Sequence, residues 1–485
     1  MAETRRPNIL FFIMDDQAPG TIHRLGNPCI ATPTLDGLAE QGVYLRPYTT
    51  VPVCTPSRAE ILSGRNAFRN GCRWFDEPIQ AGLTLLPMAL RQAGYHCGCI
   101  GKWHNDGHPA ERGFHETCGI FDCARGRPGD RIGPDNGHQF QYLDGDVLVR
   151  GHSTEVLTAS AIRFLARAPR DRPWFCYVAL HSPHDPRTAP PPWRDMYRSP
   201  LPPLPPNFMP EHPFDNGDLL IRDERLAGFP RSQEEVRRHR ADYYAMISHH
   251  DHYIGLVLHE LQRLGRYDDT LIVFTSDHGL ACGSHGLMGK ENLYEHSVRV
   301  PLLWAGPDLP RGQRYDQACL CGHYDLFPTL MDYLGLATPH SCEGISYLEV
   351  LQGRRQTVRE TICAAYRDCM RMATDGRYKL IYYPHIDRTQ LFDLVNDPYE
   401  INDLLTPWRR LAESRELTPA LSLSQRTFIP DPNPQRNGKQ AWFPLYEPAL
   451  PAAEVDRVVA RLRQVLRDWS RQLSGEEGKG GSHET

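Results

Sequence analysis

The sequence lacks an apolar run long enough to cross a bilayer, which takes roughly 20 residues. Its longest early run, from Ile9 to Met14, is only as long as a strand and is followed by Asp15. Arginines precede this run, but neither an h-region nor a cleavage site follows them. These absences argue against a membrane-spanning protein and a secretory leader, and they predict a cytoplasmic protein without a membrane partner.

The sequence also lacks an excess of either charge. Its 54 basic and 59 acidic residues give a formal net charge of −5 over 485 residues. That balance is mild for a chain of this size and gives no sign of a nucleic-acid-binding surface. Any anionic ligand is therefore expected to be attracted by cations close to its own site.

The 14 cysteines include no Cys-x-x-Cys pair. Their scattered spacing matches neither a zinc ribbon nor a compact disulfide framework in a chain this long. Most are therefore expected to be reduced and structural.

Short apolar runs alternate with helical patterns along the first 355 residues. Each run is as long as a strand and rich in β-branched or aromatic residues. The runs are Asn8 to Met14, His96 to Gly101, Trp174 to Leu180, Leu271 to Ser276 and Val300 to Ala305. This alternation predicts an α/β fold with a mostly parallel, mixed central sheet and helices on both faces. We predict that residues 1–355 form one catalytic domain.

The remaining residues, 356–485, predict a smaller α+β domain. Several strand-like runs follow one another closely, and Asp375-Gly376 between two of them is a strong hairpin signal. A small antiparallel sheet is therefore expected, followed by a proline-rich stretch from Phe428 to Pro451 and a last amphipathic helix, Ala452 to Leu473.

Polar side chains follow four of the predicted strands. In parallel sheets, ligands bind beyond the carboxyl ends of strands, so these side chains are expected to meet at one edge. They are Asp15, Asp16, Lys102, His104, His181, His184, Asp277 and His278. Two long irregular stretches, Asn105 to Gly151 and Asp185 to Pro230, are expected to be loops that shape substrate access.

The run from Cys54 to Arg65, CTPSRAEILSGR, resembles the sulfatase signature C-x-P-S-R, followed by an apolar residue and then S/T-G-R. Other motifs that resemble this family stand in the expected order: PNILFFIMDDQ, GKWH, HSPH, TSDHG, GKENLYEHSVRVPLL and QLFDLVNDPYEINDL. The resemblance covers nearly the whole chain and points to the type I, formylglycine-dependent sulfatases of the alkaline phosphatase superfamily.

The resemblance implies roles for individual residues. Cys54 would be oxidised to formylglycine by a formylglycine-generating enzyme or a radical maturase, and Arg58 would hold the product. Lys102 and Lys290 match lysines that bind sulfate oxygens. His104 matches the base that takes the hemiacetal proton, His181 matches a general acid at the leaving group, and His184 is expected beside the substrate.

A metal site is expected at the same edge of the sheet. Asp15, Asp16 and Asp277 supply carboxylates that suit Ca²⁺ or Mg²⁺ better than zinc. The resemblance adds His278 and the modified Cys54 as ligands and favours Ca²⁺, with Mg²⁺ or Mn²⁺ as alternatives. His278 stands where many relatives carry asparagine.

Three functions remain open at this point. The first is hydrolysis of a sulfate ester of a carbohydrate or another small organic molecule. The second is hydrolysis of a phosphonate monoester or phosphodiester, since related enzymes use a similar site with an Asp-His pair. The third is a silent protein that binds sulfated glycans while Cys54 stays a thiol. The threonine of CTPSR favours the sulfatase.

Overall fold

The computed structural model describes residues 6–122, 127, 129–132, 138–144, 146–316, 318–405 and 451–474. Apart from Pro451, the predicted proline-rich stretch lies outside these residues. The chain groups into two compact units. Unit 1 comprises Met1–Pro202, Arg238–Leu280 and Val298–Arg359, and unit 2 comprises Pro203–Arg237, Ala281–Ser297 and Glu360–Thr485. The predicted domains 1–355 and 356–485 stay a prediction, since a compact unit is not by itself an independently folding domain.

Unit 1 contains an eight-stranded mixed sheet, which confirms the predicted fold class. The strand order is β10 (Gln313–Arg314), β2 (Val43–Leu45), β9 (Leu302–Ala305), β8 (Thr270–Ser276), β1 (Asn8–Met14), β7 (Trp174–Ala179), β3 (His96–Lys102) and β4 (Glu116–Phe121). β9 runs antiparallel to both of its neighbours, and every other pair is parallel. The carboxyl ends of β8, β1, β7 and β3 therefore meet at one edge.

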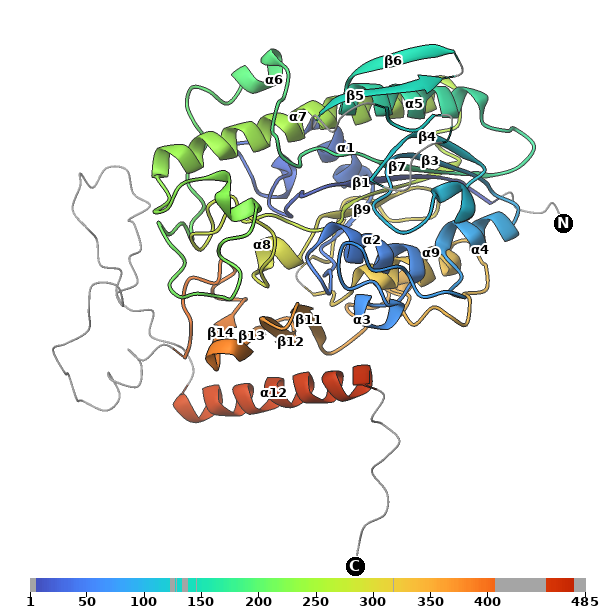
Figure 1. The fold of residues 1–485 in the computed structure, drawn as a ribbon. Helices are drawn as coiled ribbons and strands as arrows, with labels where there is room; N and C mark the ends of the chain where they lie inside the picture. The colour runs from blue at the N-terminus through green and yellow to red at the C-terminus, as the bar shows by residue number, and fades with distance from the viewer. Residues whose placement is uncertain are drawn as a thin grey trace, which may run out of the picture. The chain divides into compact units, whose positions relative to one another are not determined.

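Both faces of this sheet are covered by helices (Figure 1). Ile9, Phe11 and Ile13 of β1 point to one face and pack with α2 (Cys54–Ser63), α4 (Leu86–Gln92) and α9 (Leu326–Tyr333). Leu10, Phe12 and Met14 point to the other face and pack with α1 (Pro33–Gln41), α5 (Ser153–Arg167) and α7 (Gln233–Arg263). A strand buried on both faces has no polar alternation, which explains why β1 reads as a continuous apolar run.

The first of the two predicted irregular stretches is partly regular. It contributes β4 to the main sheet and forms a hairpin of β5 (Gln139–Asp144) and β6 (Val147–His152). These strands are short and interrupted by glycine and charged residues, so their period-2 pattern is weak. The second stretch contains only the short α6 (Pro191–Asp195) and η3 (Asp223–Leu226).

Unit 2 contains a four-stranded antiparallel sheet. Its strands are β11 (Ile362–Tyr366), β12 (Met370–Thr374), β13 (Tyr378–Tyr383) and β14 (Arg388–Asp393). The predicted turn at Asp375-Gly376 is present: Gly376 has φ 87°, and the Asp375 carboxylate accepts a hydrogen bond from Tyr378 N at 2.6 Å. The apolar stripe of α12 (Ala452–Ser474) packs on this sheet, with Leu462 fully buried.

The remaining elements are short and lie between those already described in the chain. They are η1 (His23–Leu25), α3 (Ala67–Asn70), η2 (Pro109–Glu111), α8 (Glu295–Val298), η4 (His323–Asp325), α10 (Leu348–Leu351) and η5 (Pro384–Ile386). Within the described ranges, no helix combines the length and the apolar character that a membrane span requires.

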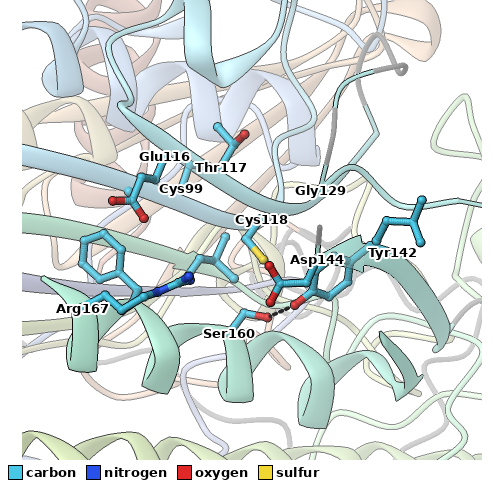
Figure 2. Close-up of a pocket in the computed structure, with 13 residues that line it drawn as sticks. Cys99, Glu116, Thr117, Cys118, Gly129, Tyr142, Asp144, Ser160 and Arg167 are labelled. Atoms are coloured by element: carbon cyan, nitrogen blue, oxygen red, sulfur yellow. Dashed lines mark hydrogen bonds between the residues drawn. The ribbon is translucent and has the colours of Figure 1, made fainter. Parts of the chain in front are cut away.

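A cavity of about 180 Å³ lies beside the β3–β4 edge of the sheet (Figure 2). Its walls come from β3, β4, β5 and α5, and the Tyr142 hydroxyl lies 2.8 Å from Ser160 Oγ across it. None of the predicted site residues lines this cavity.

Candidate active site

The ends of β1 and β8 bring the pair Asp15 and Asp16 next to the pair Asp277 and His278. Asp277 N donates to Met14 O at 3.1 Å, and Asp16 N donates to the Asp277 carboxylate at 3.2 Å. Asp16 has φ 73°, so the chain turns sharply after β1. Asp15, Asp16, Asp277 and His278 are all fully buried. The predicted convergence of these strand ends is therefore present.

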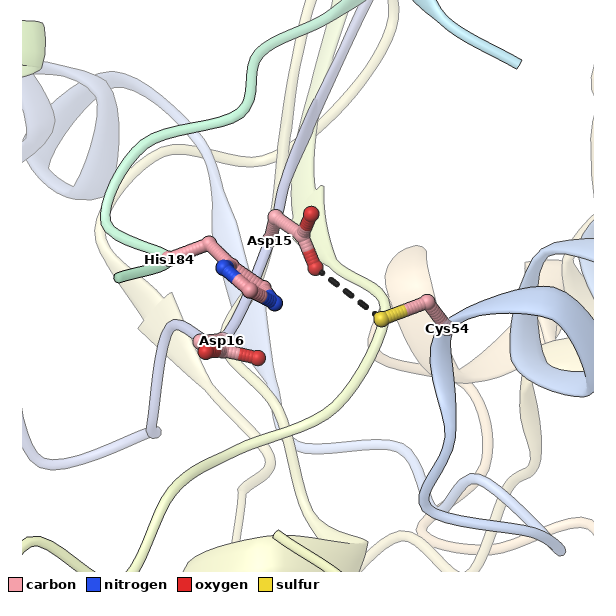
Figure 3. Close-up of side chains that lie close together, drawn as sticks. All are labelled: Asp15, Asp16, Cys54 and His184. Atoms are coloured by element: carbon pink, nitrogen blue, oxygen red, sulfur yellow. Dashed lines mark hydrogen bonds between the residues drawn. The ribbon is translucent and has the colours of Figure 1, made fainter. Parts of the chain in front are cut away.

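Cys54 is the first residue of α2 and faces this acidic cluster. Its Sγ lies 3.3 Å from the Asp15 carboxylate and 3.2 Å from His278 Nε2. Figure 3 shows the Cys54 and Asp15 side chains pointing toward each other, with Asp16 and His184 beside them. The cysteine is 2 % exposed, so its surroundings are protein groups rather than solvent.

The donor set fits a divalent cation. The ligand atoms of Asp15, Cys54, Asp277 and His278 lie within 4.8 Å of one another. Burial, and then the nearby Asp15 charge, raise the pKa of Asp277 above its ordinary value. Several carboxylates confined to a dry site repel one another, and a hard cation with oxygen ligands relieves that repulsion.

Two buried cations complete the cluster. Arg58 Nη2 lies 2.9 Å from the Asp277 carboxylate, and Lys102 Nζ lies 2.5 Å from that of Asp15. Burial alone would lower the pKa of each cation, but the carboxylates outweigh burial and the pKa of each ends above its ordinary value. Both side chains are therefore permanently charged and ready to meet an anion.

Asp122, which follows β4, joins this network. Its carboxylate lies 3.5 Å from Lys102 Nζ. Sequence reasoning missed Asp122 because the stretch around it was interpreted as an irregular loop. Recognition of TCGIF as a strand would have placed the aspartate at a strand end like the others.

His104 and the neighbouring Asn105 lie next to the first turn of α2. Asn105 Nδ2 donates to Thr55 O at 3.0 Å. His104 has φ 51° and stacks on Phe75 with ring centroids 5.5 Å apart. It is half-buried, so it can exchange protons with solvent or with a ligand.

His181 and His184 follow β7 and lie next to each other, with ring centroids 4.9 Å apart. Burial, together with the neighbouring histidines, lowers the pKa of His181 well below its ordinary value, so the ring is neutral. The ligand atom of His184 lies within 4.8 Å of those of Asp15, Asp16 and Cys54. His184, which was predicted to lie beside the substrate, is therefore also close enough to these carboxylates to bind the same metal ion.

His138 is a neighbour that sequence reasoning missed. Its ring lies 4.8 Å from that of His181, Nε2 donates to His184 O at 2.9 Å, and Nδ1 lies 2.6 Å from Ser153 Oγ. Burial lowers the pKa of His138 to about 4, so it is neutral at neutral pH. A single histidine without a motif gives no sequence signal.

Lys290 belongs to unit 2. It is buried, and its Nζ lies 3.3 Å from the Asp223 carboxylate of the same unit. Its predicted contact with sulfate rests on the GKENLYEH motif alone.

Comparison with known proteins adds a family match and close relatives. A model described as "Sulfatase" matches residues 7–336, and one described as "N-sulphoglucosamine sulphohydrolase, C-terminal" matches residues 283–422. A choline-sulfatase from Rhizobium meliloti is 31 % identical, covering 86 % of this chain and 85 % of its own. An N-acetylglucosamine-6-O-sulfatase from Bacteroides thetaiotaomicron is 26 % identical, covering 88 % and 87 %.

Solved structures share the fold. One, described as bound to its substrate D-glucosamine-2-N,6-O-disulfate, has a TM-score of 0.71 at 24 % identity and covers 85 % of this chain and 96 % of its own. A phosphonate monoester hydrolase from Agrobacterium radiobacter has a TM-score of 0.68 at 22 % identity, covering 84 % and 93 %. At these identities the likeness concerns the fold alone.

Proposed function

Because the chain belongs to the sulfatase family, a family of sulfuric ester hydrolases, we propose that it acts through a formylglycine at position 54. The observation that carries this proposal is the placement of Cys54 within 3.3 Å of the buried Asp15 carboxylate and 3.2 Å of His278. A purely structural thiol would be expected among apolar side chains.

A divalent cation would be held by Asp15, Asp16, Asp277 and His278 together with the modified residue 54. We propose Ca²⁺, with Mg²⁺ or Mn²⁺ as alternatives, because the set is rich in carboxylate oxygens. Such an ion supplies Lewis-acid polarisation of a bound sulfate oxygen. Formylglycine hydrate supplies two hydroxyls, one that attacks sulfur and one whose deprotonation releases sulfate afterwards.

The chain's own cations would bind the substrate anion. Lys102 and Lys290 are proposed to neutralise sulfate oxygens, and Arg58 to hold residue 54. Lys102 and Arg58 are fixed by carboxylates before any substrate arrives, so little reorganisation accompanies the reaction. Because the net charge of the chain is slightly negative and three carboxylates line the cluster, the attraction for the anion would come from these cations together with the bound divalent ion.

The histidines would move protons. His104 is proposed as the base that takes a proton from the hydroxyl of residue 54 when sulfate leaves. His181 or Lys290 is proposed as the acid at the leaving alcohol. The Nδ1 of His181 is buried with no hydrogen-bond partner among the described residues, and this ring would act as the acid once a bound sulfate anion raises its lowered pKa. His184 is proposed to orient the substrate beside the cluster.

The proposed substrate is a sulfated carbohydrate or another small organic sulfate. The N-acetylglucosamine-6-O-sulfatase relative supports a sugar sulfate, and the choline-sulfatase relative supports a small non-sugar ester. The loops Asn105 to Gly151 and Asp185 to Pro230 carry Arg, His and aromatic residues, which suit a sugar sulfate.

A phosphonate monoester or phosphodiester hydrolase is the second candidate. His278 beside Asp277 favours it, because related hydrolases of this kind use an Asp-His pair, whereas the shared fold is compatible with either activity. The same cations would stabilise either tetrahedral group.

The proposal is tested by comparing kcat/KM for an aryl sulfate and an aryl phosphonate. The protein should be co-expressed with a formylglycine-generating enzyme or an anaerobic radical maturase and assayed before and after chelation, with Ca²⁺, Mg²⁺ and Mn²⁺ added back. We expect the sulfate to be preferred and chelation to reduce its turnover by at least about 100-fold. A preference for the phosphonate would favour the second candidate, and binding without turnover of either ester would favour the silent binder.

A further inference from the structure

A second group of metal-binding side chains lies within unit 2. Asp368 and Cys369 belong to the tight turn between β11 and β12, and His385 lies in η5, directly after β13. Asp368 Oδ2 lies 3.1 Å from His385 Nε2, and Cys369 Sγ lies 3.6 Å from Asp368 Oδ1. The three ligand atoms all lie within 4.8 Å of one another.

The separations of Asp368 from His385 and from Cys369 are close to those of neighbouring ligands in a tetrahedral metal site. With bonds of about 2.0–2.3 Å to zinc, neighbouring N, O and S ligands are separated by about 3.3–3.6 Å. The Asp368 carboxylate lies between the other two donors, with Oδ2 next to His385 and Oδ1 next to Cys369. The pairing of β12 with β13 brings the donors together, because its antiparallel register, with Arg371 opposite Tyr382, continues to place Asp368 opposite His385.

Gly217 packs closely against Cys369, with the His385 imidazole next to it. A Cβ at this position would lie 3.2 Å from Cys369 Sγ and 3.9 Å from His385 Nδ1. The next residue, Asp218, forms an ion pair with Arg367 at 3.3 Å, so these two charges offset each other beside the turn. The backbone of Gly217 therefore forms a third wall of the group, next to the sulfur.

We infer that Asp368, Cys369 and His385 form a binding site for a single zinc-class ion, separate in composition from the carboxylate cluster at Cys54. Thiolate, imidazole and carboxylate together suit Zn²⁺ and not Ca²⁺. Asp368 is 77 % exposed and His385 is 49 % exposed, so water completes the fourth position. The ion would tie the β11–β12 turn to η5.

The other interpretation of a cysteine beside a histidine is a nucleophile. Catalytic thiols have lowered pKa values and a direct hydrogen bond to the base. Here burial, followed by the Asp368 charge, raises the pKa of Cys369 to about 11, and Asp368 lies between the thiol and the ring. A nucleophilic role is therefore not supported.

The test uses the full-length chain with Cys54→Ala, which removes the thiol of the carboxylate cluster. Co²⁺ is titrated first, because a thiolate ligand gives a near-ultraviolet charge-transfer band and tetrahedral geometry gives intense visible bands. Zn²⁺ affinity then follows from displacement of Co²⁺. The variants are His385→Gln, Asp368→Asn and Cys369→Ser, and Cys29→Ser, which removes an exposed thiol, is the matched control.

We expect one equivalent of Co²⁺ to give the thiolate band in the parent and in Cys29→Ser. The band should be lost in Cys369→Ser, and Zn²⁺ should bind at least about tenfold more weakly to Asp368→Asn and His385→Gln. These last two side chains are exposed, so their variants should fold even if Cys369→Ser does not. A parent without the band, or a His385→Gln variant with unchanged affinity, would overturn the site. Neither outcome bears on the sulfatase proposal, since all variants lack Cys54.

Discussion

Cys54 and Cys369 each lie beside a carboxylate and a histidine, yet their surroundings differ. At Cys54 the neighbouring Asp15 is fully buried and two cations, Arg58 and Lys102, bind the carboxylates. At Cys369 the neighbouring Asp368 and His385 are 77 % and 49 % exposed, so water competes for these two donors. The dry, charged cluster can stabilise charge that develops in a reaction, whereas the exposed group can only exchange water for an ion. Burial and nearby cations, more than residue type, decide which chemistry a cysteine can take part in.

The largest effect is expected for the nucleophile. Cys54→Ala should lower kcat for an aryl sulfate by about 10⁴-fold or more, because no hydroxyl remains to attack sulfur. Cys54→Ser should be sulfated once and then stall, since serine cannot expel the sulfate. Mass spectrometry of the serine variant after incubation with substrate measures this. Cys29→Ser is the control for loss of a thiol. An active Cys54→Ala variant would show that residue 54 is not the nucleophile.

The next effect compares two buried lysines. Lys102 pairs with Asp15, and Lys379 pairs with Glu400 at 2.8 Å. Replacing either with methionine removes the cation nearest to a buried carboxylate and should cost about 3–5 kcal/mol of unfolding free energy. Lys102→Met should also lower kcat/KM about 100-fold or more, because the cation proposed to bind a sulfate oxygen is lost. Denaturant titrations measure the loss of stability in each variant, and kinetics on the folded fraction measure the loss of activity. An equal loss of kcat/KM in the two variants would argue against a special role for Lys102.

Glu60, on the same helix as Cys54, provides a buried carboxyl held only by hydrogen bonds. It accepts bonds from Thr50 N and Ala67 N, and burial raises the pKa of Glu60 from 4.5 to about 7. Because the folded-state value is raised, this group's contribution to stability is complete below about pH 4.5 and is lost as pH rises through 7. Glu60→Gln removes the titration. Relative to this variant, the wild type should lose up to about 3 kcal/mol between pH 4.5 and 8. Denaturant midpoints measure the difference, and a difference independent of pH would contradict the shift.

The smallest effect is expected at His138, which we propose to position His181 and His184. His138→Phe keeps a ring against His181 but removes the hydrogen bond to His184 O. We expect kcat to fall about tenfold with KM little changed, because misplaced groups weaken the transition state more than binding. The control is His212→Phe, which removes a buried histidine bound to Tyr294 and should lower stability without changing kcat. Equal kinetic effects in the two variants would leave His138 with a structural role only.

The main sheet could be predicted because its central strands are buried on both faces. β1, β3, β7 and β8 appear as apolar runs, and the polar residues after them indicated the edge where Asp15, Asp16, Asp277 and His278 meet. The hairpin at Asp375-Gly376 was predictable from its turn chemistry. Each of these signals is local, so a single sequence is enough to read it.

The strands β4, β5 and β6 could not be predicted, because glycine and charged residues interrupt their pattern. Asp122 and His138 were missed for that reason, since their roles arise only when β4 and the β5–β6 hairpin are in place. The ring contacts of His181 with His138 and His184 depend on how side chains far apart in the sequence pack together. Neither spacing nor residue type in the sequence encodes that packing directly.

The central claim concerns the state of residue 54, and peptide mass spectrometry across residues 46–65 of protein from its native host tests it most directly. Our account predicts that Cys54 is converted to formylglycine in aerobic or anaerobic growth, while a reference peptide containing Cys97 keeps its thiol. An unmodified Cys54 thiol under both growth conditions would contradict the account.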